Sequence, residues 1–437
     1  MSHYQVSLGG LVVLCAVLFA FQPTRRQALE QQGGSRKLAS RDDEHPELLW
    51  YQAYGLATAA DWLQGPYLFS LYRDEYGLAP GLVSSLFMTD FISTAISAYF
   101  IGALSDKHGR KSLCMVYCLS YAVSCFLTIV PVTPLLFLGR ILGGISTTIL
   151  FTVFDSWMVT NFRERKLADD GCNLTRTYAT TGVVNSLAAI MSGLAGEVLV
   201  RATGTKKSPF LLSVVLLWAA LQVIWSRWTE NYGVNVSPKP VRTPAHQSLR
   251  SVFRRPTILA LVFVSTMFEG SMYLFVFYWV PTLSSVQKSS GELPYGVIFS
   301  SFMASSMAAA LAYNIIMHKQ IIKHTRLLVG ILLISDFCFI KLTGPKTEDT
   351  AFWLFCLFEA CVGMYGACIG YLKGRLIEDE GRTKIYGVMR IPLNIFVVVA
   401  LWMARDSDNF GKVFSTCSIM LTASFATMWV VILRGMP

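Results

Sequence analysis

The stretch GALSDKHGRK, residues 102–111, joins two long apolar runs at residues 82–104 and 112–130. Each run is long enough, at about 1.5 Å per helical residue, to cross a hydrocarbon core of about 30 Å. Within the stretch, Gly102 permits a close approach between helices and Gly109 permits a tight turn. The stretch therefore predicts two membrane helices joined by a short charged turn.

The rest of the chain repeats this apolar pattern. Of its 437 residues, 53% are hydrophobic and 15% are charged, and the mean hydropathy is +0.48. This leaves too little polar material to cover a soluble surface. Lipid satisfies no backbone hydrogen bonds, and the runs are continuous rather than alternating, so the spans are expected to be helices. Thirteen spans are predicted, at residues 5–21, 48–72, 82–104, 112–130, 135–158, 177–200, 209–227, 257–283, 295–316, 327–342, 352–372, 385–403 and 413–433.

These spans predict an all-α membrane protein with two six-helix bundles and one extra N-terminal transmembrane helix. The polar, Pro-rich segment 229–256 is the expected cytosolic linker between an N-terminal bundle at 48–228 and a C-terminal bundle at 257–437. Residues 1–47 are expected to hold the extra helix and a cytosolic connection. No Lys or Arg precedes that helix, whereas Arg25 and Arg26 follow it. This charge order favours a retained helix over a cleaved signal peptide.

The net charge of +10 raises the alternative of a nucleic-acid partner. However, Lys and Arg gather in alternate connections, roughly three to one in favour of the side that holds the linker. Membrane topology explains this bias, so no nucleic-acid partner is expected. The ten cysteines fall almost entirely in apolar spans without metal-ligand spacing, and no nucleophile set or phosphate-binding loop is present. We therefore expect no enzyme, no metal site and no cofactor.

Charged residues inside the spans are the candidates for a polar path. They are Asp61, Asp90, Arg140, Glu197, Glu269, Asp336, Glu359 and Arg390. Charges at membrane depth are costly and normally face water or a partner, although each one is equally consistent with a paired structural group. Asp61 and Glu269 rank first, because each lies in the first helix of its bundle and precedes a Tyr-Leu-Phe triplet, at Tyr67 and Tyr273 respectively.

Two arginines stand out among these charges. Arg140 lies about five residues below the outer end of its span, on the order of 8 Å deep. The alternative is that its side chain extends to the outer interface. Arg390 lies between Gly387 and Pro392, at an expected helix break where backbone groups are free to meet a ligand. Arg390 is therefore the favoured substrate-facing cation.

The stretch at 102–111 resembles the signature of the major facilitator superfamily, G-x-x-x-D-x-x-G-R-K, at every fixed position. A purely topological role would explain the basic residues but not the two glycines and the acid. The resemblance implies that this turn is a conformational latch, whose arginine pairs with an acid at the inner end of the fourth core helix, Asp155 in FDSW. The implied latch residues are Gly102, Asp106, Gly109, Arg110, Lys111 and Asp155.

Further blocks are similar to the molybdate-anion transporter branch of that superfamily. They are ADWLQGPY at 60–67, FDSW at 154–157, FEGS at 268–271, GVIFSSFMA at 296–304 and RIPLN at 390–394. The resemblance implies uptake of molybdate by alternating access, and a tetrahedral dianion suits guanidinium, amide and hydroxyl groups. The expected substrate-binding residues are Asp61, Gln64, Tyr67, Arg140, Glu269, Tyr273, Arg390 and Asn394.

The sequence leaves two other functions open. One is a proton-coupled sugar or organic-anion transporter, and the other is a non-transporting membrane receptor or scaffold that keeps the fold. For the favoured function, the expected partners are molybdate or a similar oxyanion, the lipid bilayer and a coupling proton. The protein is expected to be a monomer in the cell membrane.

Overall fold

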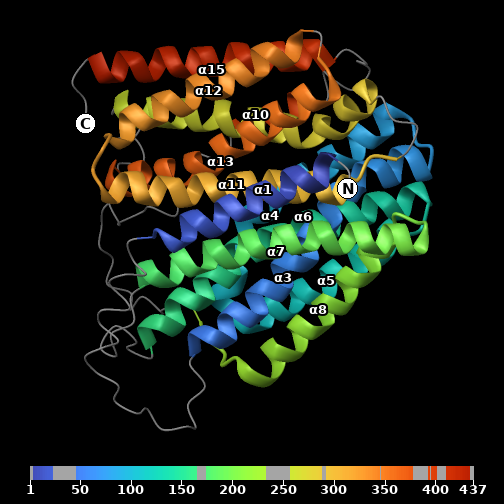
Figure 1. The fold of residues 1–437 in the computed structure, drawn as a ribbon. Coiled ribbons are helices and arrows are strands. Elements are labelled where there is room, and N and C mark those ends of the chain that lie inside the picture. Colours follow the sequence, from blue (N-terminus) through green and yellow to red (C-terminus); the bar gives the residue numbers. More distant parts are fainter. Residues whose placement is uncertain are drawn as a thin grey trace. The chain divides into compact units, whose positions relative to one another are not determined.

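The computed structural model is built almost entirely of helices (Figure 1). It describes residues 3–22, 46–164, 174–232, 256–287, 292–344, 346–376, 392–393, 395–400 and 410–433. In the first half, the helices are α3 (Pro46–Ser70), α4 (Pro80–His108), α5 (Arg110–Thr128), α6 (Thr133–Glu164), α7 (Leu174–Thr203) and α8 (Ser208–Arg227). A π-helix, η1 (Leu71–Glu75), continues α3. In this part of the chain, the described helices match the predicted spans to within four residues, except that α6 continues to Glu164 beyond the predicted end at residue 158.

The remaining described helices begin with α1 (His3–Ala20). They continue with α10 (Pro256–Val286), α11 (Tyr295–His318), α12 (His324–Thr343), α13 (Glu348–Leu376) and α15 (Phe410–Leu433). Of the predicted span at 385–403, residues 392–393 and 395–400 are described and are helical, and the others lie outside the described residues. The arrangement as twelve core helices and one extra helix therefore stays a prediction.

Ten of the described helices are long and apolar enough to cross a membrane. The two that fall short, α3 and α12, carry polar residues within their apolar runs, including Asp61 on α3 and Asp336 on α12. Large apolar side chains are exposed on the outer faces of several helices, among them Val13, Tyr99, Val215 and Ile419. Surfaces of this kind are unfavourable in water and favourable in lipid.

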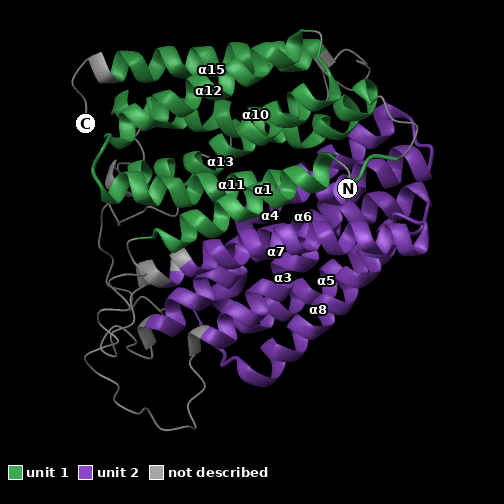
Figure 2. Ribbon diagram, in the orientation of Figure 1, with its two compact units in different colours: residues 1–36, 239–294, 301–437 green, residues 37–238, 295–300 purple. Residues whose placement is uncertain are grey.

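The chain divides into two units, which Figure 2 shows in different colours. One unit contains residues 37–238 with the first turn of α11, residues 295–300. The other contains residues 1–36, 239–294 and 301–437. The division after Pro238 falls inside the segment predicted as the linker. The domain boundaries proposed from the sequence otherwise stay predictions.

Helix α1 packs on helices of the C-terminal half, whereas the sequence analysis treated residues 1–47 as a segment apart. The Tyr4 hydroxyl donates to Glu348 of α13 at 2.6 Å. Farther along, the Cys15 thiol donates to the carbonyl of Ala304 on α11, and the Gln22 amide donates to that of Leu311 at 2.9 Å. These bonds join polar groups that lipid would leave unsatisfied, so they fix α1 to α11 and α13.

Candidate functional site

The turn between α4 and α5 depends on Gly109. Its φ angle of 96° lies in the left-handed region, which glycine adopts without steric cost. This agrees with the tight turn expected there. The close helix approach expected at Gly102 was wrong: a Cβ added there would meet no atom within 4 Å, because its face of α4 is exposed, whereas its place in the latch stays a prediction. Close helix approach is found elsewhere, at Gly144.

Arg110, the first residue of α5, ties this turn to the inner end of α6. Its guanidinium group donates to Asp106 at 2.9 Å, to the carbonyl of Ser156 at 3.3 Å and to the Thr160 hydroxyl. The side chain therefore reaches α6 at the residue that follows Asp155. The specific pairing of Arg110 with Asp155 stays a prediction, but the contact of the signature turn with this part of α6 is present.

Glu230 contacts the signature turn, and the sequence analysis missed it. Its carboxylate accepts from the backbone N–H groups of Lys111 and Ser112 at 2.8 and 3.1 Å, and from the Ser112 hydroxyl at 2.6 Å. It therefore caps the positive N-terminus of α5, which Gly109 has no side chain to cap. The sequence does show that α5 would begin without a capping side chain. It does not show that the capping carboxylate lies about 120 residues farther along the chain.

The Asp155→Lys variant tests the latch. It places a second positive charge beside the Arg110 contact, so we expect it to slow transport about tenfold, the effect of about 1.4 kcal/mol on one step. Substrate affinity in equilibrium binding should change less than about twofold, because the latch acts on switching. Initial rates in vesicles and equilibrium binding are the measurements, with Asp155→Glu as the charge-preserving control. An unaltered turnover in folded Asp155→Lys protein would remove the latch hypothesis.

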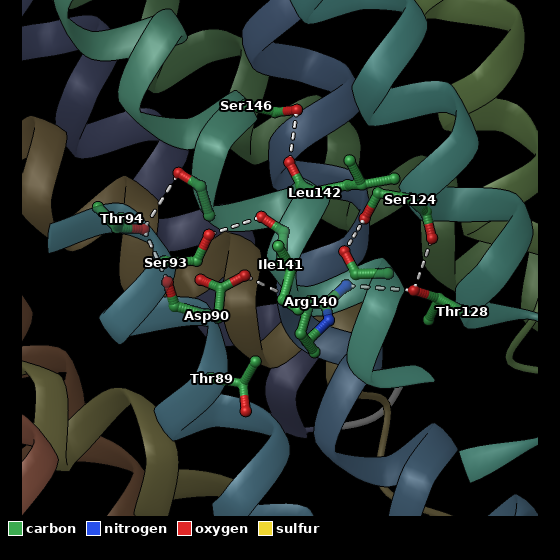
Figure 3. Close-up of polar contacts among 12 residues, drawn as sticks. Thr89, Asp90, Ser93, Thr94, Ser124, Thr128, Arg140, Ile141, Leu142 and Ser146 are labelled. Carbon is green, nitrogen blue, oxygen red and sulfur yellow. Dashed lines mark hydrogen bonds and ion pairs between the residues drawn. The ribbon is translucent and has the colours of Figure 1, made fainter. Parts of the chain in front are cut away.

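The centre of the first half is Arg140 of α6, which is 6% exposed. Its Nη2 donates to the Thr128 hydroxyl at 3.2 Å, and its Nη1 lies 3.8 Å from the Asp90 carboxylate. Figure 3 shows Asp90 and Thr128 on either side of the guanidinium group. Burial with these partners excludes the alternative that the side chain extends to the interface. Within the described part of the chain, the buried Nε–H has no hydrogen-bond acceptor.

Helices α4 and α6 meet closely beside this arginine. A Cβ added at Gly144 would overlap the carbonyl oxygen of Asp90 and lie 2.8 Å from the Ser93 Cβ. The Ser93 hydroxyl donates to the carbonyl of Ile141 at 2.7 Å, and that of Thr94 donates to the carbonyl of Gly144 at 3.2 Å (Figure 3). Small residues at the contact and hydrogen bonds between helices are typical of tightly packed membrane helices. This contact positions Asp90 against Arg140.

The other substrate-binding candidates of the first half separate into two groups. The Asp61 carboxylate accepts from the Tyr121 hydroxyl at 2.5 Å and lies close enough to Arg140 for an electrostatic interaction. Gln64 donates to the carbonyl of Ala60 within its own helix. Asp61 and Arg140 are therefore brought together, whereas the hydrogen bond of Gln64 stays within its own helix.

Tyr67 takes part in a separate buried network. Its hydroxyl donates to Glu197 of α7 at 3.3 Å, and the same carboxylate accepts from the Gly296 N–H at 3.0 Å. Arg201 neutralises Glu197 from one turn away, at 2.8 Å. The hydrogen bonds at Glu197 place Tyr67 with α7, and among the described contacts none joins Tyr67 to Arg140.

In the second half, Glu269 of α10 meets α13. Its carboxylate accepts from the Tyr365 hydroxyl at 3.2 Å and lies 3.5 Å from the Lys373 Nζ. The ring of Phe268 stacks on that of Tyr365, with centroids 3.9 Å apart. Lys373 lies just beyond the predicted span 352–372, so by sequence it belongs to the connecting Lys and Arg that indicate topology. Three-dimensional packing makes it the cationic partner of Glu269.

The structure says less about the three remaining substrate-binding candidates. Tyr273 belongs to α10, whereas Arg390 and Asn394 lie outside the described residues. The substrate-facing role of Arg390 therefore stays a prediction. Among the other acids in the spans, Asp336 accepts from the hydroxyls of Ser418 and Thr422 at 2.5 and 2.8 Å.

Comparisons with known proteins identify relatives of this chain. A family model described as sugar transporters with 12 transmembrane segments matches residues 4–344. The molybdate-anion transporter of Xenopus tropicalis is 29% identical over 425 residues, which cover 95% of this chain and 91% of the relative. The molybdate-anion transporter of Takifugu rubripes is 30% identical over 414 residues, covering 85% of this chain and 84% of the relative.

Two solved structures of transporters share this fold. The crystal structure of a nucleoside transporter aligns with a TM-score of 0.69 and 11% identity, covering 88% of this chain and 99% of that chain. A D-xylose-proton symporter aligns with a TM-score of 0.64 and 12% identity, covering 88% and 95%. At such identities the likeness shows the fold alone. The sequence matches, together with the apolar helices, make this protein a multi-pass membrane transporter and not an enzyme. The chain belongs to the sugar-transporter family, with 12 transmembrane segments, of the major facilitator superfamily.

Proposed function

We propose that this protein takes up molybdate, or a similar tetrahedral oxyanion, across the cell membrane by alternating access. The supporting observation is Arg140, a buried guanidinium group inside the helices of the first half. Its Nε–H lacks an acceptor within the described residues, and its nearest carboxylate lies at 3.8 Å, beyond hydrogen-bond distance. A planar fork with unused donors suits an oxyanion. The relatives named molybdate-anion transporters support this choice of substrate.

The charges around Arg140 support proton coupling. Asp61 and Asp90 both interact with this single guanidinium group, so two ionised carboxylates would leave the cluster with an excess negative charge. A dianion would be repelled from such a cluster, because like charges in a medium of low dielectric repel strongly. Binding therefore requires that protons neutralise carboxyl groups first. We propose that anion and proton move together, and that the transporting unit is a monomer.

A sugar is the second candidate substrate. The matching family model is described as sugar transporters, and one structural neighbour is a D-xylose-proton symporter. A neutral sugar would use the same hydroxyl and carboxyl groups as hydrogen-bond partners without requiring a cation. Arg140 favours the anion, because its unpaired donor is better satisfied by a charged acceptor.

A counterflow assay tests the proposed substrate. Vesicles containing the purified protein are loaded with unlabelled molybdate, sulfate, tungstate or xylose, and entry of labelled molybdate is measured. We expect loaded molybdate and tungstate to drive entry, with sulfate weaker and xylose inactive. Entry driven by xylose alone would replace the anion proposal with sugar transport. Failure of all these solutes in folded protein would favour another organic anion or the non-transporting receptor or scaffold.

A further inference from the structure

Glu359 of α13 differs from the other acids in the spans because, among the residues that the structure describes, it has no charged or hydrogen-bonding partner. Its side chain is 5% exposed. Within the described part of the chain, no hydrogen bond or ion pair is formed by its carboxyl group. The one titratable neighbour that senses its charge there is the thiol of Cys356, one turn away on the same helix. A lone carboxylate in this environment is unfavourable, so the group is expected to be neutral.

The face of α13 that carries Glu359 packs against α11. Cys356, Glu359 and Gly363 follow one another at helical spacing and therefore share a face. Cys356 interacts with the Ser305 hydroxyl, and a Cβ added at Gly363 would overlap the backbone of Ser306. Glu359 thus lies between two points where α13 touches α11. The facing segment of α11, residues 301–310, contains serine, alanine, methionine and phenylalanine but no charged residue.

The described charged groups near α13 form no hydrogen bond or ion pair with Glu359. Among the described residues, the acids on the adjacent helices have partners of their own. Glu269 of α10 pairs with Tyr365 and Lys373, Asp336 of α12 bonds with Ser418 and Thr422, and Glu348 at the start of α13 accepts from Tyr4 of α1. The described lysines and arginines of these helices lie near the helix ends: Arg326 in the first turn of α12 and Lys341 in its last turn, Lys373 near the end of α13 and Lys412 in the first turn of α15. None of these cations forms an ion pair with Glu359.

We propose that Glu359 binds the proton that accompanies the transported anion. The carboxyl group holds the proton while the face between α11 and α13 is closed, and releases it when rearrangement of these helices admits water. A group that is neutral when buried and ionised when hydrated converts a conformational change into proton transfer. This assignment rests on the proposed transport function. It assigns Glu359 a role separate from the carboxyl groups beside Arg140: those groups are neutralised where the anion binds, whereas Glu359, which has no such partner among the described residues, takes up and releases the proton as the helices move.

The Glu359→Gln variant tests this assignment in vesicles with an inward proton gradient. Glutamine keeps the size of the side chain but binds no proton. We expect the variant to lose gradient-driven accumulation of molybdate while its counterflow stays within about twofold of the unsubstituted protein, a loss of coupling without loss of binding. Asp336→Asn is the matched control, because this acid lies in a span but has two hydroxyl donors, and it should keep both activities.

A second measurement does not depend on the substrate. Infrared spectroscopy of the purified protein at neutral pH detects the C=O stretch of protonated carboxyl groups. We expect Glu359→Gln to remove one such band and Asp336→Asn to leave it. If molybdate is not the substrate, the unsubstituted protein will show neither accumulation nor counterflow, yet the band difference will remain. Three results overturn the assignment: an unchanged band in Glu359→Gln, retained gradient-driven accumulation, or loss of counterflow together with accumulation in folded variant protein.

Discussion

The Arg140→Gln variant is expected to lower molybdate uptake about 100-fold or more. The substitution removes the fork and the charge proposed to hold the anion, and it leaves Asp61 and Asp90 without their shared cation. Hydrogen bonds to charged groups contribute about 1.5–3 kcal/mol each, and about 1.4 kcal/mol corresponds to a factor of ten. Loss of one or two such bonds to the anion therefore accounts for the expected decrease. Initial uptake rates in vesicles are the measurement.

Two further variants separate substrate binding from folding. Arg201→Gln is the matched control. Like Arg140, Arg201 pairs with an acid, but its partner Glu197 lies one turn away on the same helix and the Arg201 side chain is 58% exposed. We expect Arg201→Gln to keep uptake within about twofold, since exposed ion pairs contribute about 0–1 kcal/mol. Arg140→Lys keeps the charge without the fork and should retain partial uptake. If folded Arg140→Gln protein takes up molybdate normally, Arg140 is not the anion site.

The Gly144→Ala variant is expected to destabilise the protein and to impair transport with it. A Cβ at this position would overlap the backbone oxygen of Asp90 and lie 2.9 Å from the Thr94 nitrogen. Neither backbone atom moves without separating α4 from α6, and this separation would carry Asp90 away from Arg140. Overpacking of this kind costs about 1–3 kcal/mol. Thermal unfolding of the purified protein and uptake in vesicles are the two measurements.

The control for this prediction is another glycine within a helix. A Cβ added at Gly182 of α7 would meet no atom within 4 Å, so Gly182→Ala should leave the unfolding temperature unchanged or raise it slightly. A Gly144→Ala protein as stable and active as the unsubstituted chain would show that α4 and α6 do not need this close contact.

The sequence predicted the helices well, because the local composition of a membrane span is decisive by itself. Continuous apolar runs of sufficient length gave bounds close to those of α4, α5 and α10, and the glycine of the charged turn indicated where α4 ends. The orientation in the membrane, inferred from the placement of Lys and Arg, stays a prediction. The family resemblance was carried by local motifs, and comparison with relatives confirmed it.

The sequence was less informative about which helices and side chains meet. It named Arg140 and Asp61 as candidates, but not that Asp90 and Thr128 contact the guanidinium group. It assigned close packing to Gly102, where the structure leaves open space, and the close contact occurs at Gly144.

Only the tertiary structure decided which distant segments contact one another. Glu230 caps α5, Lys373 reaches Glu269 and α1 packs on α11, all through contacts between residues far apart in the chain. The packing of the helices likewise gives the neighbouring acids partners and, among the described residues, gives Glu359 none. Hydrophobic length is a property of each segment and can be read along the chain, whereas the partner of a buried charge depends on which helix faces fold together.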